Sequence, residues 1–293
     1  MPRAELVTVG EAFEDLIFFG LPHLPRSGEE VRTHGFARTI GGGALITAIA
    51  AARLGVRTRV VSAVSDAAVH VLRAERISLE NLRRADEPHA VTVSLSTSHN
   101  RGFVTFSGVN DRLEARFRNA LNRLRRVYVH LAFSPAHCAW WQRAVERLRA
   151  DGSIISGDFG WNEPLRKDRA FLPMLCALDY VFLNEDEALL YSGQRTLRAA
   201  AEFWRSHTRN TVIKLGRRGS RWLDAERDLS VPAPRVRPLD TTGAGDAFNG
   251  AFLYARIMGL APRQSLRIAN LVGALSTRAP GGIDALPRLG DLP

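Results

Sequence analysis

The chain has 293 residues, enough for one large α/β domain, and its 45% hydrophobic and 24% charged residues exclude wholesale disorder. The net charge of +10 is spread over short arginine pairs without a run of five basic residues, so we expect no nucleic-acid surface. Cys138 and Cys176 are too few for a disulfide framework and are expected to be buried free thiols. With no signal peptide and no stretch of about 18 apolar residues, the composition predicts a soluble cytoplasmic protein.

The first third of the chain predicts a strand, a buried helix and a hairpin. Residues 5–10 form a short apolar strand that ends at glycine. Gly41 to Gly43 open an apolar segment, 44–54, which predicts a buried helix with Gly55 at its C-terminal end. Residues 59–64 predict the next strand. Residues 91–96 and 102–106 are β-branched and aromatic around a polar turn, which is typical of a hairpin.

From residue 126 onward, predicted strands and helices alternate. The strands are expected over 126–132, 153–156, 180–183 and 211–214. The helices are expected over 139–150, around 167–177, and over 185–192, 197–207, 245–258 and 262–277. This alternation indicates parallel βαβ units in a doubly wound sheet. Without an internal repeat or linker, we expect one domain over 1–293, with small β additions near 16–40 and 91–108.

The segment that carries the chemistry is Asp-Thr-Thr-Gly-Ala-Gly-Asp-Ala-Phe-Asn-Gly, residues 240–250. Its small residues let a ligand approach the backbone, and a helix start offers unpaired N–H groups and the positive end of the helix dipole. This is an anion site suited to phosphate. Asp246, in the first turn, would accept the proton of an attacking hydroxyl. From these residues alone, a helix-capping role for Asp246 stays open.

Three motifs give the chain a family resemblance. The 240–250 string resembles the C-terminal signature of the ribokinase family, also called the PfkB carbohydrate kinases. Residues 41–55 resemble that family's N-terminal glycine-rich signature, and 184–187, Asn-Glu-Asp-Glu, resemble its Asn-x-x-Glu motif. Their order suits the family and spans essentially the whole chain. No P-loop of the form G-x-x-x-x-G-K-[ST] occurs.

The resemblance implies a ribokinase-like three-layer α/β/α sandwich with a mostly parallel central sheet and a small β lid over the substrate. It implies ATP as donor, Asp246 as catalytic base, and an anion hole made by the amides of Gly243, Ala244 and Gly245. The implied nucleotide contacts are Lys214, Gly216, Gly219, Asn270 and Gly273. Asn184 and Glu187 would organise Mg²⁺, largely through water. Asp240 and Thr242 fall where many members bind a monovalent cation, so K⁺ is a further candidate.

On the acceptor side, the resemblance implies that Asp15, Gly41 and Gly42 bind the substrate. Ile46 stands where the family usually has an asparagine that contacts substrate, so one polar contact is expected to be absent. Two further departures are the missing glycine after Asp66 and the Asp158-Phe159-Gly160 sequence in place of Asp-x-Asn. Phe106 either faces the substrate from the lid or packs within the hairpin. The phosphoryl-transfer half therefore looks intact and the acceptor half altered.

The sequence thus predicts an ATP-dependent kinase that phosphorylates a hydroxyl of a sugar or sugar-like small molecule. A nucleoside kinase of the same fold is an alternative, because an apolar Ile46 would tolerate a less polar acceptor. A non-catalytic ligand-binding member is a further alternative, but the intact Asp246 argues against it. The exposed hairpin edges make a homodimer through the lid strands plausible.

Overall fold

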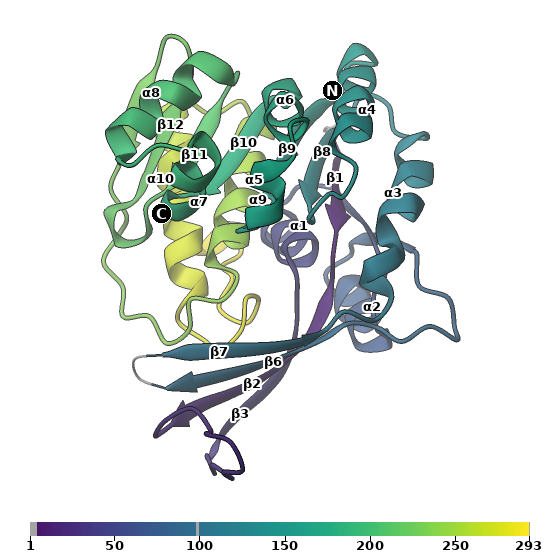
Figure 1. The fold of residues 1–293 in the computed structure, drawn as a ribbon, viewed down its shortest axis with the longest axis vertical. Helices are drawn as coiled ribbons and strands as arrows, with labels where there is room; N and C mark the ends of the chain where they lie inside the picture. The colour runs from purple at the N-terminus through teal and green to yellow at the C-terminus, as the bar shows by residue number, and fades with distance from the viewer. Residues whose placement is uncertain (1–4, 98–99, 293) are drawn as a thin grey trace.

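The computed structural model describes residues 5–97 and 100–292 and contains two sheets. The large sheet has nine strands in the order β13-β12-β11-β10-β9-β8-β1-β4-β5, and the small sheet has four in the order β3-β2-β6-β7. Figure 1 shows the small sheet projecting beneath a layered body of helices and strands. The functional residues predicted above are distributed over both parts.

Seven neighbouring strands of the large sheet are parallel, and two antiparallel strands extend one edge. The parallel strands are β1 (Leu6–Gly10), β4 (Thr58–Ser62), β5 (Ser78–Asn81), β8 (Tyr128–Ala132), β9 (Ile154–Gly157), β10 (Tyr180–Asn184) and β11 (Thr211–Lys214). The antiparallel strands are β12 (Ser220–Leu223) and β13 (Asp228–Val231). The central strands are rich in Val, Ile and Leu because both of their faces are buried.

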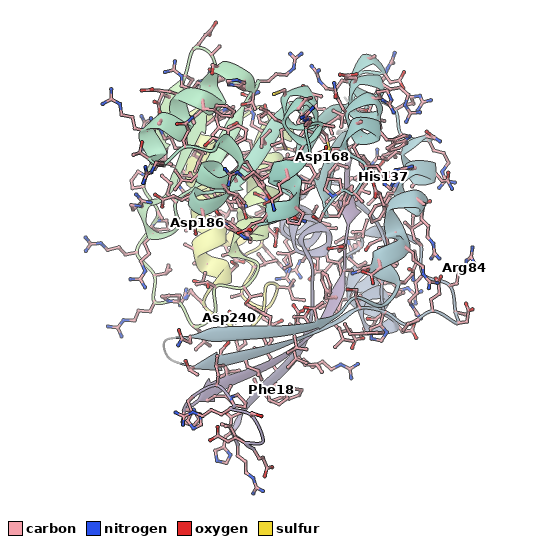
Figure 2. All side chains as sticks on the ribbon, in the orientation of Figure 1. Phe18, Arg84, His137, Asp168, Asp186 and Asp240 are labelled. Atoms are coloured by element: carbon pink, nitrogen blue, oxygen red, sulfur yellow. The ribbon has the colours of Figure 1, made fainter. Side chains whose placement is uncertain are left out.

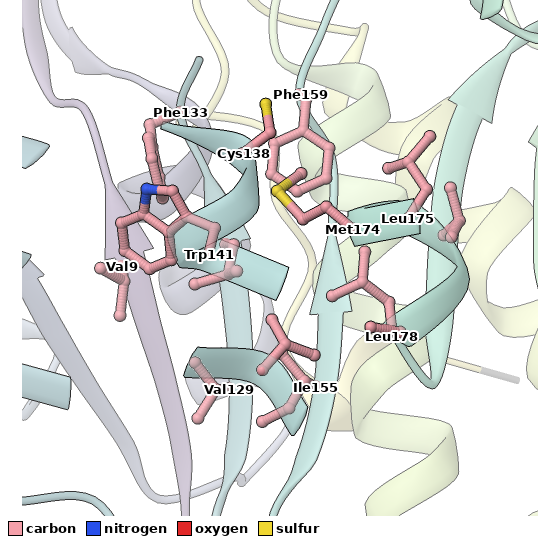
Figure 3. Close-up of a cluster of buried hydrophobic side chains, with 14 of the residues drawn as sticks. Val9, Val129, Phe133, Cys138, Trp141, Ile155, Phe159, Met174, Leu175 and Leu178 are labelled. Atoms are coloured by element: carbon pink, nitrogen blue, oxygen red, sulfur yellow. The ribbon is translucent and has the colours of Figure 1, made fainter. Parts of the chain in front are cut away.

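Helices cover both faces of the large sheet, and each face has its own hydrophobic core. The helices over one face are α1 (Gly43–Arg53), α2 (Asp66–Ala74), α9 (Ala244–Ile257) and α10 (Pro262–Ser276). Those over the other are α3 (Leu113–Leu121), α4 (Cys138–Ala150), α5 (Glu163–Lys167), α6 (Phe171–Ala177), α7 (Glu185–Ser192) and α8 (Leu197–His207). Figure 3 shows part of this second core, where Trp141 packs 4.8 Å from Phe133 between ring centroids. The predicted three-layer sandwich is confirmed.

The small sheet presents one face to the sandwich and one face away from it. It consists of β2 (Phe13–Leu21), β3 (Gly35–Gly41), β6 (Val91–Thr97) and β7 (Arg101–Phe106). Asp15 pairs with Thr39 and Thr92, and this face meets the sandwich because Ile17 and Thr39 lie against Gly281. Val91 precedes Thr92 and therefore faces the other way, and it pairs with Glu14 on one side and with Phe106 on the other. Glu14 and Phe106 thus lie on the opposite face of the small sheet. Figure 2 shows Asp240 between the small sheet and the sandwich, with Phe18 on the small sheet.

Most of the predicted elements are confirmed, including the 91–106 hairpin and the helices α7 to α10. The helix expected around 167–177 is present as α6, but it begins at Phe171, because the chain turns after α5, where the Asp168 side chain accepts the Ala170 N–H. The sequence interpretation had no account of α2, β5, α3, β12 and β13. Cys138 is buried as expected, but Cys176 is only partly buried. No helix in the described part of the chain is long and apolar enough to cross a membrane.

Candidate active site

The predicted site residues gather at the carboxyl ends of the parallel strands. From β1 the chain first proceeds to β4 and β5 on one side, and later adds β8 to β11 on the other. The strand order therefore switches direction between β1 and β8, which is where open α/β sheets bind ligands. Gly10 pairs with Ala132 at this point, and an added Cβ on Gly10 would lie 2.1 Å from the Ala132 carbonyl oxygen.

The start of α9, where the anion site is predicted, lies over this edge. Gly243 is its N-cap residue, with a left-handed φ of 71°, and Asp246 lies in the first turn. The Ala244 N–H makes a long 3.3 Å bond to the Thr241 carbonyl, and a helix start leaves its first amides without intrahelical partners. The Asp246 carbonyl accepts a bond from the Thr47 hydroxyl, which ties α9 to α1. The nest and the carboxylate thus face the cleft together.

Asp246 has the electrostatic properties of a group that can take up a proton near neutral pH. Burial of the carboxyl group is the main cause, and the neighbouring Asp158 adds to it, so the pKa of Asp246 rises to about 7. The Lys214 ammonium opposes this rise. The residue stays partly accessible from the cleft. A carboxylate in this position can therefore act as a general base without being locked in its ionised form.

This pKa predicts a pH dependence. A base works only when deprotonated, so a pKa raised to about 7 places the loss of kcat/KM in the neutral range. We expect kcat/KM to fall about tenfold per pH unit below about pH 6 and to level off above about pH 8. The measurement is kcat/KM for the acceptor at saturating MgATP over this range. A profile that stays flat down to about pH 5 would contradict the assignment.

The residues predicted to bind the acceptor are connected to Asp246 through the run of glycines at 41–43. A Cβ added to Gly41 would lie 2.0 Å from Asp15 Oδ2, and one added to Gly43 would lie 3.1 Å from Asp246 Oδ1. Because these glycines are two residues apart, the carboxyl groups of Asp15 and Asp246 lie close enough for one small molecule to contact both. Burial and the nearby Asp240 raise the pKa of Asp15 to about 7.

The structure places the other two residues assigned to the acceptor side in different surroundings. Ile46 is buried, 2% exposed, and its Cδ1 fills the space between Gly243 and Gly282. It therefore packs against the N-cap residue of α9. Phe106 is 58% exposed and lies on the face of the small sheet opposite to Asp15. Strand pairing, which the sequence did not supply, decides this orientation.

A pocket of about 600 Å³ adjoins the nest and contains most of the predicted nucleotide contacts. The predicted residues in its lining are Lys214, Gly216, Gly219, Ala244, Gly245, Asn270 and Gly273. Asn270 lines the pocket, but its amide donates to the Val231 and Pro232 carbonyls and so fixes the loop after β13. The sequence interpretation did not include Phe248, Thr241 and the arginines at 217, 235 and 237, which also line the pocket.

Asn184 and Glu187 lie next to the pocket instead of in its lining. Asn184 is the β10 neighbour of Lys214, and it forms a capping box with Glu187 at the start of α7. The Glu187 carboxylate accepts the Asn184 N–H at 2.8 Å and its Nδ2 at 2.7 Å. Among residues 5–97 and 100–292, no three His, Cys, Asp or Glu side chains are placed to hold a metal. The predicted role of Asn184 and Glu187 in organising Mg²⁺ through water stays a prediction.

Asp240 and Thr242, the candidates for a monovalent-cation site, shape the loop that precedes the nest. Asp240 Oδ1 accepts the N–H and the hydroxyl of Thr242, and Oδ2 accepts the Gly281 N–H. The segment after Gly281 is in turn held by Arg53 at the end of α1, whose Nη1 donates to the carbonyls of Ile283 and Leu286. The far C-terminal part of the chain therefore closes one side of the nest.

Sequence reasoning assigned no role to three charged or polar residues near the ends of β1 and β9 and on α9, although it named Asp158 as a departure from the family. Asp158 follows β9 and accepts bonds from Lys214 and Asn249. Asn249 lies one helical turn after Asp246 in the motif, and this spacing was an available signal. Glu11 follows the last residue of β1, and burial with nearby Asp111 raises its pKa to about 7. Its place directly after the first strand could have indicated it.

The predicted anion site, the adjoining pocket and Asp246 lie together at this edge of the α/β sandwich, as expected for a phosphotransferase with an alcohol group as acceptor. Residues 3–289 match the family model described as pfkB family carbohydrate kinase. The chain belongs to this family.

The relatives agree with this membership. Ribokinase of Bacillus subtilis (strain 168) is 25% identical over 270 residues, which cover 90% of this chain and 89% of that protein. The structure of adenosine kinase from Sinorhizobium meliloti matches with a TM-score of 0.82 at 19% identity, over 98% of each chain. An Escherichia coli protein solved in complex with ATP and Mg²⁺ matches with a TM-score of 0.80 at 23% identity, over 98% of this chain and 97% of that one.

Proposed function

We propose that this protein transfers the γ-phosphate of ATP to a hydroxyl of a sugar-like small molecule, with Asp246 as the general base. The observation that carries the proposal is the position of Asp246. It lies beside the nest of residues 243–245 and is linked through Gly43 and Gly41 to Asp15. Phosphoryl transfer needs a donor pocket, an anion site and a base in this order, and the cleft supplies them.

In the proposed reaction, ATP occupies the pocket beside Gly273 with its phosphates at the start of α9. Asp15 holds acceptor hydroxyls and directs one of them toward Asp246. Asp246 takes the proton of that hydroxyl as its oxygen attacks the γ-phosphorus, and ADP leaves. The amides of residues 243–245 stabilise charge on the transferred group. Mg²⁺, when bound with the nucleotide, neutralises charge on the phosphates.

The charge of the cleft favours a neutral polyhydroxy acceptor over a sugar acid or a sugar phosphate. Burial is the main cause of the raised pKa values of Asp15 and Asp246, and Asp240 adds to the first and Asp158 to the second, so each of the two groups has a further carboxylate beside it. An acceptor with its own negative charge would be repelled by the field of these carboxylates.

The experiment that tests the proposed function is ADP release with MgATP against a panel of acceptors. The panel contains neutral sugars, sugar acids, sugar phosphates and nucleosides. We expect stimulation by a neutral polyol or sugar. If only a nucleoside stimulates ADP release, the acceptor is a nucleoside and not a neutral sugar. An absence of stimulation together with unchanged melting temperature in MgATP would contradict the kinase function itself.

The outer face of the small sheet supports a second proposal, a homodimer through the lid strands. Phe36, Val104 and Phe106 on this sheet are 55%, 67% and 58% exposed. Exposed apolar side chains gathered on one face indicate an interaction surface, and β3 and β7 are unpaired edges. We expect a dimer in sedimentation velocity at micromolar concentration, and a monomer after Phe36→Glu with Phe106→Glu. A monomeric wild-type protein would contradict this proposal.

A further inference from the structure

Lys214, Asp158 and Asn249 form a polar cluster directly beneath the nest. Asp158 Oδ2 accepts Lys214 Nζ at 2.5 Å and Asn249 Nδ2 at 2.7 Å. The side chains of Lys214 and Asp158 are only 15% and 10% exposed. The cluster joins the ends of β9 and β11 to α9, one turn after Asp246. Three elements that meet at the reacting centre are thus joined through one carboxylate oxygen.

The Lys214 ammonium opens onto the phosphate end of the pocket. A Cβ added to Gly245 would lie 3.0 Å from Nζ, so the ammonium lies against the nest itself. Lys214 also lines the nucleotide pocket. Three carboxyl groups, those of Asp158, Glu187 and Asp246, act on this one ammonium and keep its pKa raised. A triphosphate bound in this pocket would place its γ-phosphoryl group beside the Lys214 ammonium, whose charge balances these three carboxyl groups.

A purely structural ion pair would not need this position or this residue type. Buried ion pairs contribute little to stability compared with apolar packing, whereas Lys214 also lines the pocket. Of the 40 basic residues in the chain, only Lys167 and Lys214 are lysines. An ammonium is a compact charge with three rotatable donors, so it can serve Asp158 and a phosphoryl oxygen together, which a guanidinium fork does less readily.

We propose that Lys214 is a catalytic residue that donates to an oxygen of the transferred phosphoryl group, and that Asp158 and Asn249 are positioning residues that aim it. The inference rests on the proposed kinase function. The bond between the γ-phosphorus and the β,γ-bridging oxygen breaks and the bond to the acceptor oxygen forms. The acceptor proton goes to Asp246, and ADP leaves with the bond electrons. Lys214 keeps its proton throughout and balances charge on the phosphoryl oxygens.

The kinetic test compares Lys214→Met with the double variant Lys214→Met/Asp158→Asn. The single change leaves the buried Asp158 carboxylate without its ion-pair partner, so we expect a lower melting temperature. The double variant removes the charge of Asp158 as well, so we expect its melting temperature to recover. We expect kcat to fall about 10²- to 10³-fold in both variants. Recovery of kcat together with the melting temperature would overturn the inference. Arg149→Met is the matched control, because Arg149 pairs with Asp179 in a similarly buried ion pair away from the cleft, and its kcat should stay unchanged.

The binding test needs no acceptor and uses MgADP and a non-hydrolysable ATP analogue as probes. We expect Lys214→Met to keep the affinity for MgADP and to lose about tenfold for the analogue, since only the analogue carries a γ-phosphoryl group. Equal loss for both probes would overturn the inference while the kinase function stands. A wild-type protein that binds neither probe would overturn the proposed function, and the inference with it.

Discussion

Asp246→Asn is expected to lower kcat by about 10²- to 10⁴-fold while the folded structure persists, because a positioned general base contributes about that much. Asparagine keeps the shape and the helix-start position of the aspartate but cannot accept the proton of the acceptor hydroxyl. The pKa of Asp246, raised to about 7, means that the wild-type group is ready to exchange a proton at neutral pH. The measurement is steady-state ADP release with the acceptor that the panel identifies.

The control for this substitution is Asp151→Asn, which removes a carboxylate at the end of α4 that pairs with Arg125. Its kcat should match that of the wild type, so general effects of losing a charge are separated from loss of the base. The affinity of Asp246→Asn for MgADP should also be unchanged, since the nucleotide pocket is intact. A kcat within about threefold of the wild-type value would contradict the assignment of Asp246.

Gly243→Ala is the second large effect that we expect, because it combines backbone strain with a collision. Gly243 has φ of 71°, and a non-glycine residue in this region costs about 1–2 kcal/mol. The added Cβ would lie 2.6 Å from Ile46 Cδ1 and 2.9 Å from Gly282 Cα. The nest must shift to relieve these contacts, so we expect kcat to fall by about 10² or more. The melting temperature should fall by several degrees.

Gly259→Ala is a matched control, because Gly259 has φ of 70° and no neighbouring atom within 4 Å of an added Cβ. It imposes the same backbone strain without the collision, so it should lower the melting temperature and leave kcat unchanged. Ile46→Ala combined with Gly243→Ala removes one of the two collisions and should recover part of kcat. Equal kcat for Gly243→Ala and the wild type would show that the nest does not act on the transferred group.

The layered fold could be predicted because its signals are local. Apolar strands that end at glycine, and helices such as α8 with clear boundaries, follow from patterns within about a dozen residues. Two of the missed elements differ in this respect. Strand β5 is a four-residue edge strand with exposed ends, and its structure depends on pairing with β4, which no local pattern reveals. Helix α2 has a local signal, the N-cap Ser65 followed by Asp66, which the sequence interpretation did not use.

The candidate site likewise has one part that a local motif predicts and another part that depends on the assembled fold. The 240–250 motif indicated the nest and Asp246, because a helix start beside small residues has a local signature. The orientation of Phe106 depends on which residue of β6 it opposes, and the position of Ile46 depends on how α1 crosses α9. Asp158 is separated from Lys214 by 56 residues and from Asn249 by 91. Contacts at such separations come from the assembled fold and not from any single segment.

The hydrogen bonds from Arg53 to the carbonyls of Ile283 and Leu286 affect the order in which parts of the protein fold. They join positions separated by 230 and 233 residues, and the segment they hold also supports Asp240 through Gly281. Contacts with such long separation form late, since closing a long loop costs entropy before the contact forms. The 281–286 segment is therefore expected to dock late in folding, and the loop before α9 is completed only then.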